Sequence, residues 1–292
     1  MKSYVKKVKH LVEYAVFIIL TSFLKILSID KSASLCSFIA RKIGPHLTVT
    51  NIARSNLKKA YGKDVDIEKT IDELWDNYGR YIGEFPFINR MTAQELQTRV
   101  KLTGLEHIEH FRKIRQPFIL FLGHQANWDF MIRRINDIYP KFGVVYRKAN
   151  NPYVDSNILK ERGDHRDITM IAKGSEGVKD LVRSIKSCMS IAMLVDQKMN
   201  DGIEVPFFGK PAMTAPAVAR FSLQYDYPIV PCQLIRLEGS YFKLRIHAPL
   251  KYSNTGDIEK DCYNIMLTIN KKLEEWIRQR PGQWFWFHNR WK

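Results

Sequence analysis

Residues 117–129 have the sequence Pro-Phe-Ile-Leu-Phe-Leu-Gly-His-Gln-Ala-Asn-Trp-Asp. The apolar run that ends at Leu122 is short and lies between proline and glycine, as expected of a buried strand. His124 follows Gly123 directly, and Asp129 lies five residues further on. A histidine that follows a strand and begins a helix is exposed at the carboxyl edge of a sheet, where ligands bind in open α/β folds. This stretch therefore predicts an α/β fold with a reactive site at the end of one strand.

The remaining sequence continues this alternation of short apolar runs and helical patterns. Further strands are predicted at residues 143–146, 168–172, 191–195, 229–236 and 241–246, and helices at residues 177–186, 215–224 and 257–280. Residues 29–115 have mainly helical patterns, and Thr92 with Glu95 forms a capping box at one helix start. Strands that alternate with helices predict a central, mostly buried sheet flanked by helices.

The amino terminus combines basic residues with an apolar stretch. Residues 11–27 are apolar apart from Glu13 and Lys25, and their uncharged part is residues 14–24. A full helical span needs about 20 mainly apolar residues, so this helix either makes a short single pass or lies in the membrane interface. A buried core helix is the alternative. We predict a membrane-anchoring helix at residues 1–30, followed by a domain at 31–292 with a helical cap (31–115) and an α/β core (116–292).

The composition points to an anionic partner. The chain has 46 Lys and Arg against 30 Asp and Glu, a net charge of +16. Nucleic acid, anionic lipid, a phosphorylated substrate or an acidic carrier protein would each suit this charge. We find no zinc knuckle, RNA-binding segment or clear helix-turn-helix, and the apolar amino terminus disfavours a nucleic-acid-binding protein. The four cysteines match no metal or redox spacing, so we expect reduced thiols, no metal site and no cofactor.

The pair of His124 and Asp129 suggests acid–base chemistry. A carboxylate bonded to one imidazole nitrogen fixes the tautomer, which leaves the other nitrogen free to deprotonate a hydroxyl. No serine or cysteine nucleophile lies nearby in the sequence, which favours direct transfer over a covalent intermediate. The spacing alone is common by chance, and a histidine at a helix start often serves only as a hydrogen-bonding residue. Its significance depends on the segments that follow.

Several segments downstream complete an ordered series. They are Tyr-Arg-Lys-Ala-Asn-Asn-Pro at 146–152, Arg162, Asp-Gln at 196–197, Val-Pro-Phe-Phe-Gly-Lys-Pro-Ala-Met-Thr at 205–214 and an aromatic, basic carboxyl end at 283–292. Together with the histidine segment, this series closely resembles the lauroyl/myristoyl acyltransferases of lipid A biosynthesis, within the lysophospholipid acyltransferase superfamily. The resemblance covers roughly residues 117–292. This family often has Glu where this chain has Asp129, and both residues supply a carboxylate.

The resemblance implies catalytic roles for three residues. His124 would act as general base on the hydroxyl of a 3-hydroxyacyl chain carried by a lipid A precursor. Asp129 would orient His124 and support its charge. The resulting alkoxide would attack an acyl thioester, and Arg162 or backbone N–H groups near the helix start would stabilise the oxyanion.

Three further residues are predicted to bind substrate. Arg147 and Asn151 either contact a substrate phosphate or shape the loop at Asn-Asn-Pro. Asp196 matches a family position at a strand end, with a helix cap or an arginine partner as the alternative roles. Phe-Phe-Gly at 207–209 is expected to shape the acyl pocket or a turn. The tryptophans at the carboxyl end are either core residues or a surface that faces membrane or substrate.

The resemblance also implies partners and a location. The donor would be an acyl carrier protein thioester, the acceptor a lipid A precursor, and the site of action the cytoplasmic face of the inner membrane. Phosphates, sugar-acid carboxylates, acidic carrier protein and anionic lipid would all suit the basic surface. A lysophospholipid or glycerol-phosphate acyltransferase would share the same motif and thioester chemistry. A membrane-associated protein without activity is a third alternative.

Overall fold

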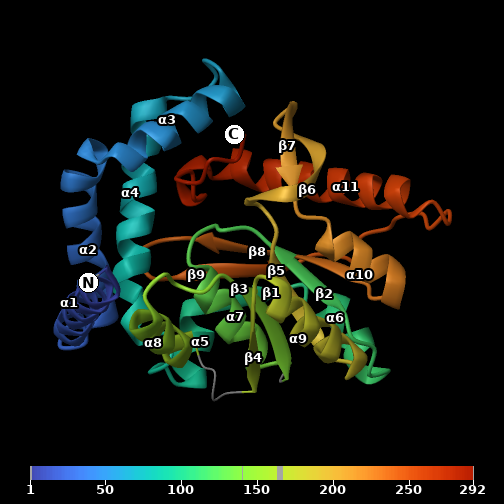
Figure 1. The fold of residues 1–292 in the computed structure, drawn as a ribbon, viewed down its shortest axis with the longest axis horizontal. Coiled ribbons are helices and arrows are strands. Elements are labelled where there is room, and N and C mark those ends of the chain that lie inside the picture. Colours follow the sequence, from blue (N-terminus) through green and yellow to red (C-terminus); the bar gives the residue numbers. More distant parts are fainter. Residues whose placement is uncertain (1, 140, 163–166, 292) are drawn as a thin grey trace.

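The computed structural model describes residues 2–139, 141–162 and 167–291. Figure 1 shows an α/β molecule in which helices surround a central sheet. The helices of the amino-terminal part are α1 (Lys2–Leu24), α2 (Ile29–Ile43), α3 (Thr48–Tyr61), α4 (Ile67–Glu84), α5 (Ala93–Arg99) and α6 (Glu106–Lys113). Those of the remaining part are α7 (Trp128–Asn136), α8 (Pro152–Arg162), α9 (Ser175–Lys186), α10 (Ala217–Tyr225) and α11 (Ile258–Gln279). Short 3-10 helices are η1 (Gly44–His46), η2 (Phe85–Phe87) and η3 (Pro281–Gln283).

The main sheet has seven strands in the order β1-β9-β8-β2-β5-β3-β4. Their bounds are β1 (Val100–Thr103), β2 (Ile119–Leu122), β3 (Phe142–Tyr146), β4 (Ile168–Ala172), β5 (Ser190–Leu194), β8 (Ile229–Arg236) and β9 (Phe242–Ile246). Strands β8, β2, β5, β3 and β4 run parallel, whereas β9 is antiparallel to β8 and β1 runs parallel to β9. The carboxyl ends of the five parallel strands therefore meet along one edge.

Apolar side chains cover both faces of this sheet. Ile119 and Phe121 of β2 pack into one core with α9, α10 and α11, whereas Leu120 and Leu122 pack into another core with α5, α6 and α7. All four β2 residues are fully buried. A strand buried on both faces has no polar alternation, which explains its continuous apolar sequence.

The amino-terminal helices form a layer beside the sheet. Figure 1 shows α2 and α4 side by side at the left, with α1 near the start of α2. The close approach of α2 and α4 requires Gly79 and Gly83, because a Cβ at either position would lie within 2.7 Å of α2 backbone atoms. Hydrogen bonds from Asn151 and Asn157 tie α8 to α1.

The predicted α/β class and the central, mostly buried sheet flanked by helices are confirmed. Each predicted strand has a counterpart within two residues at either end, and the capping box at Thr92 is present. The sequence analysis missed β1, which lies in a region expected to be helical, and the hairpin of β6 (Lys198–Phe207) and β7 (Lys210–Thr214). The hairpin turns at Phe208 and Gly209, which both have positive φ. The turn expected at Phe-Phe-Gly is thus present.

The described helices include none that is long and apolar enough to cross a membrane. Helix α1 is 23 residues long but contains charged residues along its first half. The division of the chain at residues 30 and 115 and the anchoring role of α1 stay predictions.

Candidate active site

The turn after β2 holds His124 at the carboxyl edge of the sheet. Helix α7 begins only at Trp128, where the Asn127 side chain accepts a hydrogen bond from the backbone of Phe130. The residues between β2 and α7 thus form an irregular turn instead of a helical start, with Ala126 at a φ of 50°. A Cβ on Gly123 would meet Leu273 at 3.1 Å and Asp196 at 3.5 Å. Glycine at this position lets the turn approach the neighbouring strand end.

Asp196 is the carboxylate that contacts His124. The distance from His124 Nδ1 to Asp196 Oδ1 is 2.7 Å, and the backbone N–H of His124 donates to Asp196 Oδ2, also at 2.7 Å. The indole of Trp284 donates to the same Oδ2 at 2.6 Å. The carboxylate accepts from both residues, so its position relative to the imidazole is fixed.

The pKa of Asp196 shows that this carboxylate is strongly favoured as an anion. Burial alone would raise its pKa, but the charge of His124 and the hydrogen bonds from His124 and Trp284 outweigh burial and lower the pKa to about 2. An ionised carboxylate beside Nδ1 places the hydrogen of the neutral imidazole on that nitrogen. The other nitrogen, Nε2, then has a free lone pair, and the side-chain amide of Gln197 lies 3.4 Å from it.

Asp129 belongs to a second buried cluster. Arg162 Nε lies 2.9 Å from Asp129 Oδ1, and the hydroxyl of Tyr81 donates to Oδ2 at 2.9 Å. Burial raises the pKa of Tyr81 well above its ordinary value, as does the charge of Asp129, so the phenol stays protonated. Burial lowers the pKa of Arg162, but the charge of Asp129, the electrostatic effect of Tyr81 and the hydrogen bonds to both residues together outweigh burial and raise the pKa. The cluster thus contains an anion, a cation and a neutral donor.

The prediction that Asp129 orients His124 is wrong, because Asp129 contacts Arg162 and Tyr81 instead. Trp128 stacks on Tyr81 and meets the imidazole of His124 edge-on, so its ring lies beside both residues. Asp129 faces Arg162 because α7 begins at Trp128, which turns this carboxylate toward α8 and not back toward the turn. The predicted binding role of Asp196 is likewise corrected, since its two oxygens are engaged by His124 and Trp284.

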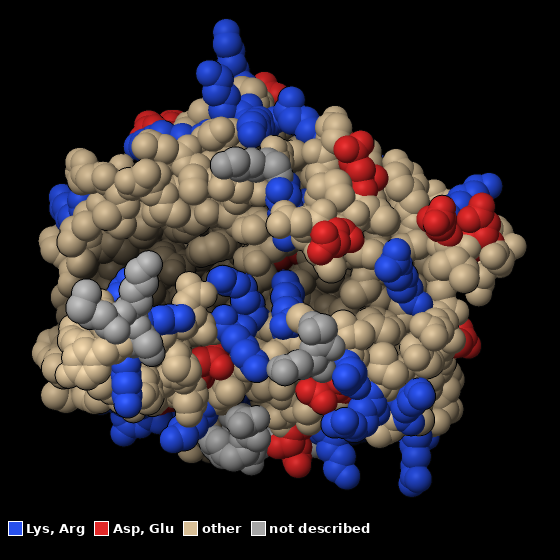
Figure 2. All heavy atoms as spheres, viewed as in Figure 1, with Lys and Arg blue, Asp and Glu red and all other residues tan. Residues whose placement is uncertain are grey.

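Both clusters line one cavity of about 190 Å³. Its polar wall includes His124, Asp129, Arg147, Arg162 and Gln197, and its apolar wall comes from α7 and the ends of β3 and β5. Figure 2 shows a hollow in the viewed face with Lys and Arg side chains at its rim. An imidazole, a guanidinium and apolar side chains thus surround one space.

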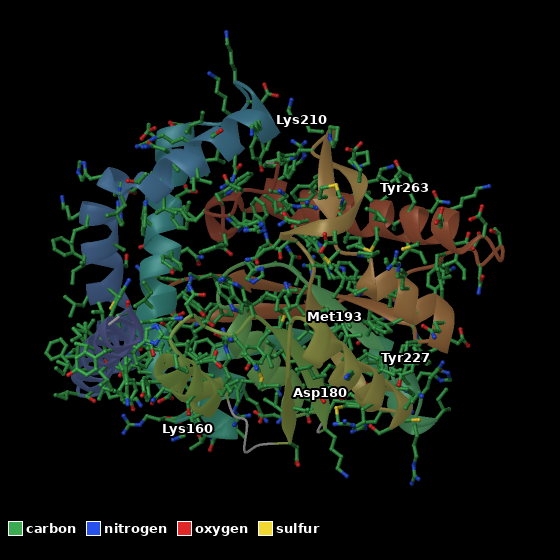
Figure 3. The ribbon with its side chains drawn as sticks, viewed as in Figure 1. Lys160, Asp180, Met193, Lys210, Tyr227 and Tyr263 are labelled. Carbon is green, nitrogen blue, oxygen red and sulfur yellow. The ribbon has the colours of Figure 1, made fainter. Side chains whose placement is uncertain are left out.

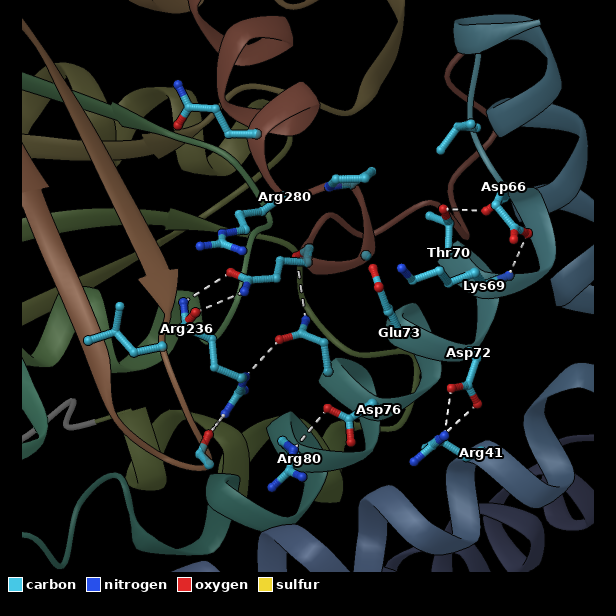
Figure 4. Close-up of a pocket in the computed structure, with 18 of the residues that line it drawn as sticks. Arg41, Asp66, Lys69, Thr70, Asp72, Glu73, Asp76, Arg80, Arg236 and Arg280 are labelled. Carbon is cyan, nitrogen blue, oxygen red and sulfur yellow. Dashed lines mark hydrogen bonds and ion pairs between the residues drawn. The ribbon is translucent and has the colours of Figure 1, made fainter. Parts of the chain in front are cut away.

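A larger cavity of about 720 Å³ lies between α4, η3 and the β8–β9 turn (Figure 4). Its charged side chains largely satisfy one another: Arg41 pairs with Asp72, and Arg80 pairs with Asp76. Arg236 at its wall bonds Asn77 and the buried Glu84. No histidine lines this cavity among the described residues, so we assign the chemistry to the smaller one.

Comparison with known proteins identifies the family. The family described as "Bacterial lipid A biosynthesis acyltransferase" matches residues 1–292. The chain belongs to this family. It is 23% identical over 229 residues to the "Lipid A biosynthesis myristoyltransferase" of Escherichia coli (strain K12), which covers 76% of this chain and 68% of that protein. It has the same identity and coverage with the "Lipid A biosynthesis acyltransferase 1" of Shigella flexneri.

The chain is therefore an acyltransferase. Two further residues of this acyltransferase, Arg147 and Asn151, were predicted to bind substrate or to shape a loop. Arg147 is exposed at the cavity wall, where its guanidinium contacts Asn150. Asn151 is buried away from the cavity: its oxygen caps α8, and its amide donates to His10 and Glu13 of α1. Asn151 thus shapes the loop, the second of its two predicted roles.

The aromatic carboxyl end of this acyltransferase is core. Trp284 and Trp286 are buried, and their ring centroids lie 4.5 Å apart. Arg290 is fully buried and donates to Thr214 and to the carbonyl of Met213. Of the two alternatives for these residues, the core role holds for Trp284, Trp286 and Arg290.

Several residues of the acyltransferase site had no specific role predicted from the sequence. Tyr81 and Trp284 hold the two aspartates, while Gln197 and Lys173 line the cavity. Gln197 and Lys173 follow the predicted strands at 191–195 and 168–172, so their position after strand ends could have indicated them. Tyr81 and Trp284 come from a helix and a coil segment far away in sequence, and no local pattern identifies them.

Proposed function

We propose that this acyltransferase transfers a fatty acyl chain from an acyl carrier protein thioester to the hydroxyl of a 3-hydroxyacyl chain on a lipid A precursor. The observation that carries the proposal is the His124–Asp196 pair at the wall of a cavity that also holds Arg162. Membership of the family supplies the substrate class. The names of the relatives support a lipid A precursor as acceptor.

In the proposed mechanism His124 is the general base. Asp196 holds Nδ1, so Nε2 takes the proton of the acceptor hydroxyl as the oxygen attacks the thioester carbonyl carbon. The tetrahedral intermediate then collapses with loss of the thiolate. The thiolate recovers the proton from Nε2, which returns the imidazole to its neutral form.

Arg162 is proposed to stabilise the oxyanion. It lines the cavity together with His124 and keeps its charge because Asp129 lies beside it. Asp129 and Tyr81 act as positioning residues, since they fix the guanidinium instead of the imidazole. A preorganised donor of this kind typically contributes on the order of 10²-fold to 10³-fold in rate.

We further propose that the enzyme binds the inner membrane through α1 and α2. Helix α1 exposes apolar side chains, including Val12, Val16, Ile19 and Phe23, and α2 exposes Phe38 and Ile39. Lys6, Lys7 and Lys9 lie in the first half of α1 and suit anionic lipid. An amphipathic helix with this pattern lies in the interface plane.

The decisive experiment measures acyl transfer from a series of acyl carrier protein thioesters to a tetra-acylated, sugar-acid-bearing lipid A precursor. Wild-type membranes are compared with His124→Ala membranes containing the same amount of folded protein. Transfer that is lost in the variant supports the proposal. Acylation of a lysophospholipid in the same assay, without transfer to the lipid A precursor, would overturn it.

A further inference from the structure

A second cavity lies on the other side of the parallel strand ends from the active-site cavity. It has a volume of about 250 Å³, and apolar side chains make up most of its wall. They come from α9, α10 and the ends of β3, β4 and β5, and include Val178, Leu181, Met193 and Val218. Met193, labelled in Figure 3, lies in the interior of the molecule.

The two cavities share part of their walls. Val145, Lys173, Leu194 and Gln197 line both of them. Gln197 also lies 3.4 Å from His124 Nε2, the atom proposed to take the proton. An acyl group whose carbonyl carbon lies beside His124 would therefore find the second cavity directly behind this shared wall.

The position of the second cavity indicates whether the donor or the acceptor acyl chain enters it. The proposed membrane-binding helix α1 packs on α8, the helix that supplies Arg162, so a lipid acceptor would approach from the α8 side. The second cavity is lined by α9 and α10, which Figure 1 shows on the opposite side of the molecule from α1 and α2. A donor acyl chain that a carrier protein delivers from the aqueous side could enter the second cavity between α9 and α10 without passing through the space that the acceptor occupies.

We infer that the cavity between α9, α10 and the strand ends holds the fatty acyl chain of the donor thioester, and that Leu181 helps to set the accepted chain length. This inference rests on the proposed function. Leu181 lines the second cavity but not the shared wall, so it lies toward the part that a longer chain would reach. Each methylene group of the acyl chain that becomes buried, or is no longer buried, changes the affinity for the chain by roughly fourfold.

The test compares kcat/KM for acyl carrier protein thioesters of increasing chain length. Leu181→Ala enlarges the cavity and is expected to raise the relative kcat/KM of a chain two carbons longer by up to about fifteenfold. Ala217→Leu, in the wall formed by α10, is expected to lower kcat/KM for the longest accepted chain by a similar factor. Ile185→Ala is the matched control, because Ile185 is buried on the same helix but does not line the cavity.

An unchanged chain-length preference in Leu181→Ala and Ala217→Leu, with transfer intact, would overturn the inference while the proposed function stands. So would a change only in the KM for the lipid acceptor, because the cavity would then hold an acceptor chain. No transfer by the wild-type enzyme would overturn the proposed function itself.

A second measurement does not depend on turnover or on the folding of a variant. A fatty acyl thioester with a photoreactive diazirine at its terminal carbon is bound to the wild-type enzyme and irradiated. Labelled peptides from α9, α10 or β5 support the inference. Labels confined to α1, α2 or α8 contradict it.

Discussion

At the residue scale, the site contains two pairs, His124 with Asp196 and Asp129 with Arg162. The five-residue interval between His124 and Asp129 suggested a dyad, but His124 pairs with Asp196, which is 72 residues away. The register of β2 on β5 places Leu122 opposite Leu194, and so brings His124 and Asp196 to the same level of the sheet edge. The sequence predicted both strands but not that they are neighbours, and only their adjacency selects the partner.

The first prediction concerns the partner of the imidazole. Asp196→Asn keeps the shape of the side chain but removes the charge that fixes the tautomer of His124. We expect kcat to fall on the order of 10³-fold to 10⁴-fold, the scale known for a histidine that loses its carboxylate. Asp180→Asn, at an exposed ion pair on α9, is the control and should leave kcat unchanged. A loss of less than about tenfold in Asp196→Asn would refute the assignment.

The second prediction is a pH effect on stability. The folded-state pKa of Asp196 is about 2, below its ordinary value of 3.8. A depressed carboxylate pKa adds stability that is fully present above about pH 4 and is lost as the pH falls through about 2. Acid unfolding followed by circular dichroism should therefore depend less on pH between 4 and 2 in Asp196→Asn than in the wild type. An identical pH dependence in both proteins would count against the depressed pKa.

The third prediction concerns Tyr81. Tyr81→Phe removes one hydrogen bond to Asp129 but keeps the ring that stacks on Trp128. We expect a fall in kcat of about tenfold to 100-fold, because a hydrogen bond to a charged group contributes about 1.5–3 kcal/mol. Since Tyr81 acts through Asp129 and Arg162, the pH profile set by His124 should stay in place. A shifted profile would show that Tyr81 instead acts on the imidazole.

At the element scale, one buried network joins three parts of the chain. Glu84, at the end of α4, is fully buried and pairs with Arg236 of β8. It also accepts hydrogen bonds from Ser240 and from Asn127, the residue that caps α7. The turn that carries His124 is thus attached to both α4 and the sheet. Sequence patterns predicted α4 and β8, but a buried ion pair between them has no periodic signal.

The fourth prediction tests this network. Arg236→Met leaves the Glu84 carboxylate buried without its cation, which should lower the free energy of unfolding by about 3–5 kcal/mol. The same change at Arg54, whose pair with Glu68 is largely exposed, should cost less than about 1 kcal/mol. Urea unfolding measures both. Addition of Glu84→Gln to Arg236→Met should recover part of the loss, and a further loss in the double variant would contradict this account.

At the scale of the whole molecule, exposed apolar side chains are concentrated on the amino-terminal helices α1 and α2. The prediction of a helix there was correct, and none of the described helices is long and apolar enough to cross a membrane. The structure adds that α1 packs against α8 beside the site instead of standing apart from it. Sequence analysis had no means to find this contact, because residues near 14 and 157 share no local pattern.

The fifth prediction tests the membrane-binding role of α1. Ile19→Glu places a charge on its exposed apolar face and should weaken co-sedimentation with anionic phospholipid vesicles by about tenfold. Ile258→Glu, at an exposed position on α11, is the matched control and should bind as the wild type does. Equal binding of both variants would remove α1 from the proposed membrane surface.

The hydrogen bond from Trp284 to Asp196 also has a consequence for biosynthesis. The ribosome makes α1 before the α/β core, so under the proposed membrane role α1 would reach the bilayer while the core is still to be translated. The indole that holds the carboxylate of Asp196 does not exist until residue 284 has been added. A chain halted before this point would lack a fixed base, so catalytic competence would arrive only after Trp284 has been translated.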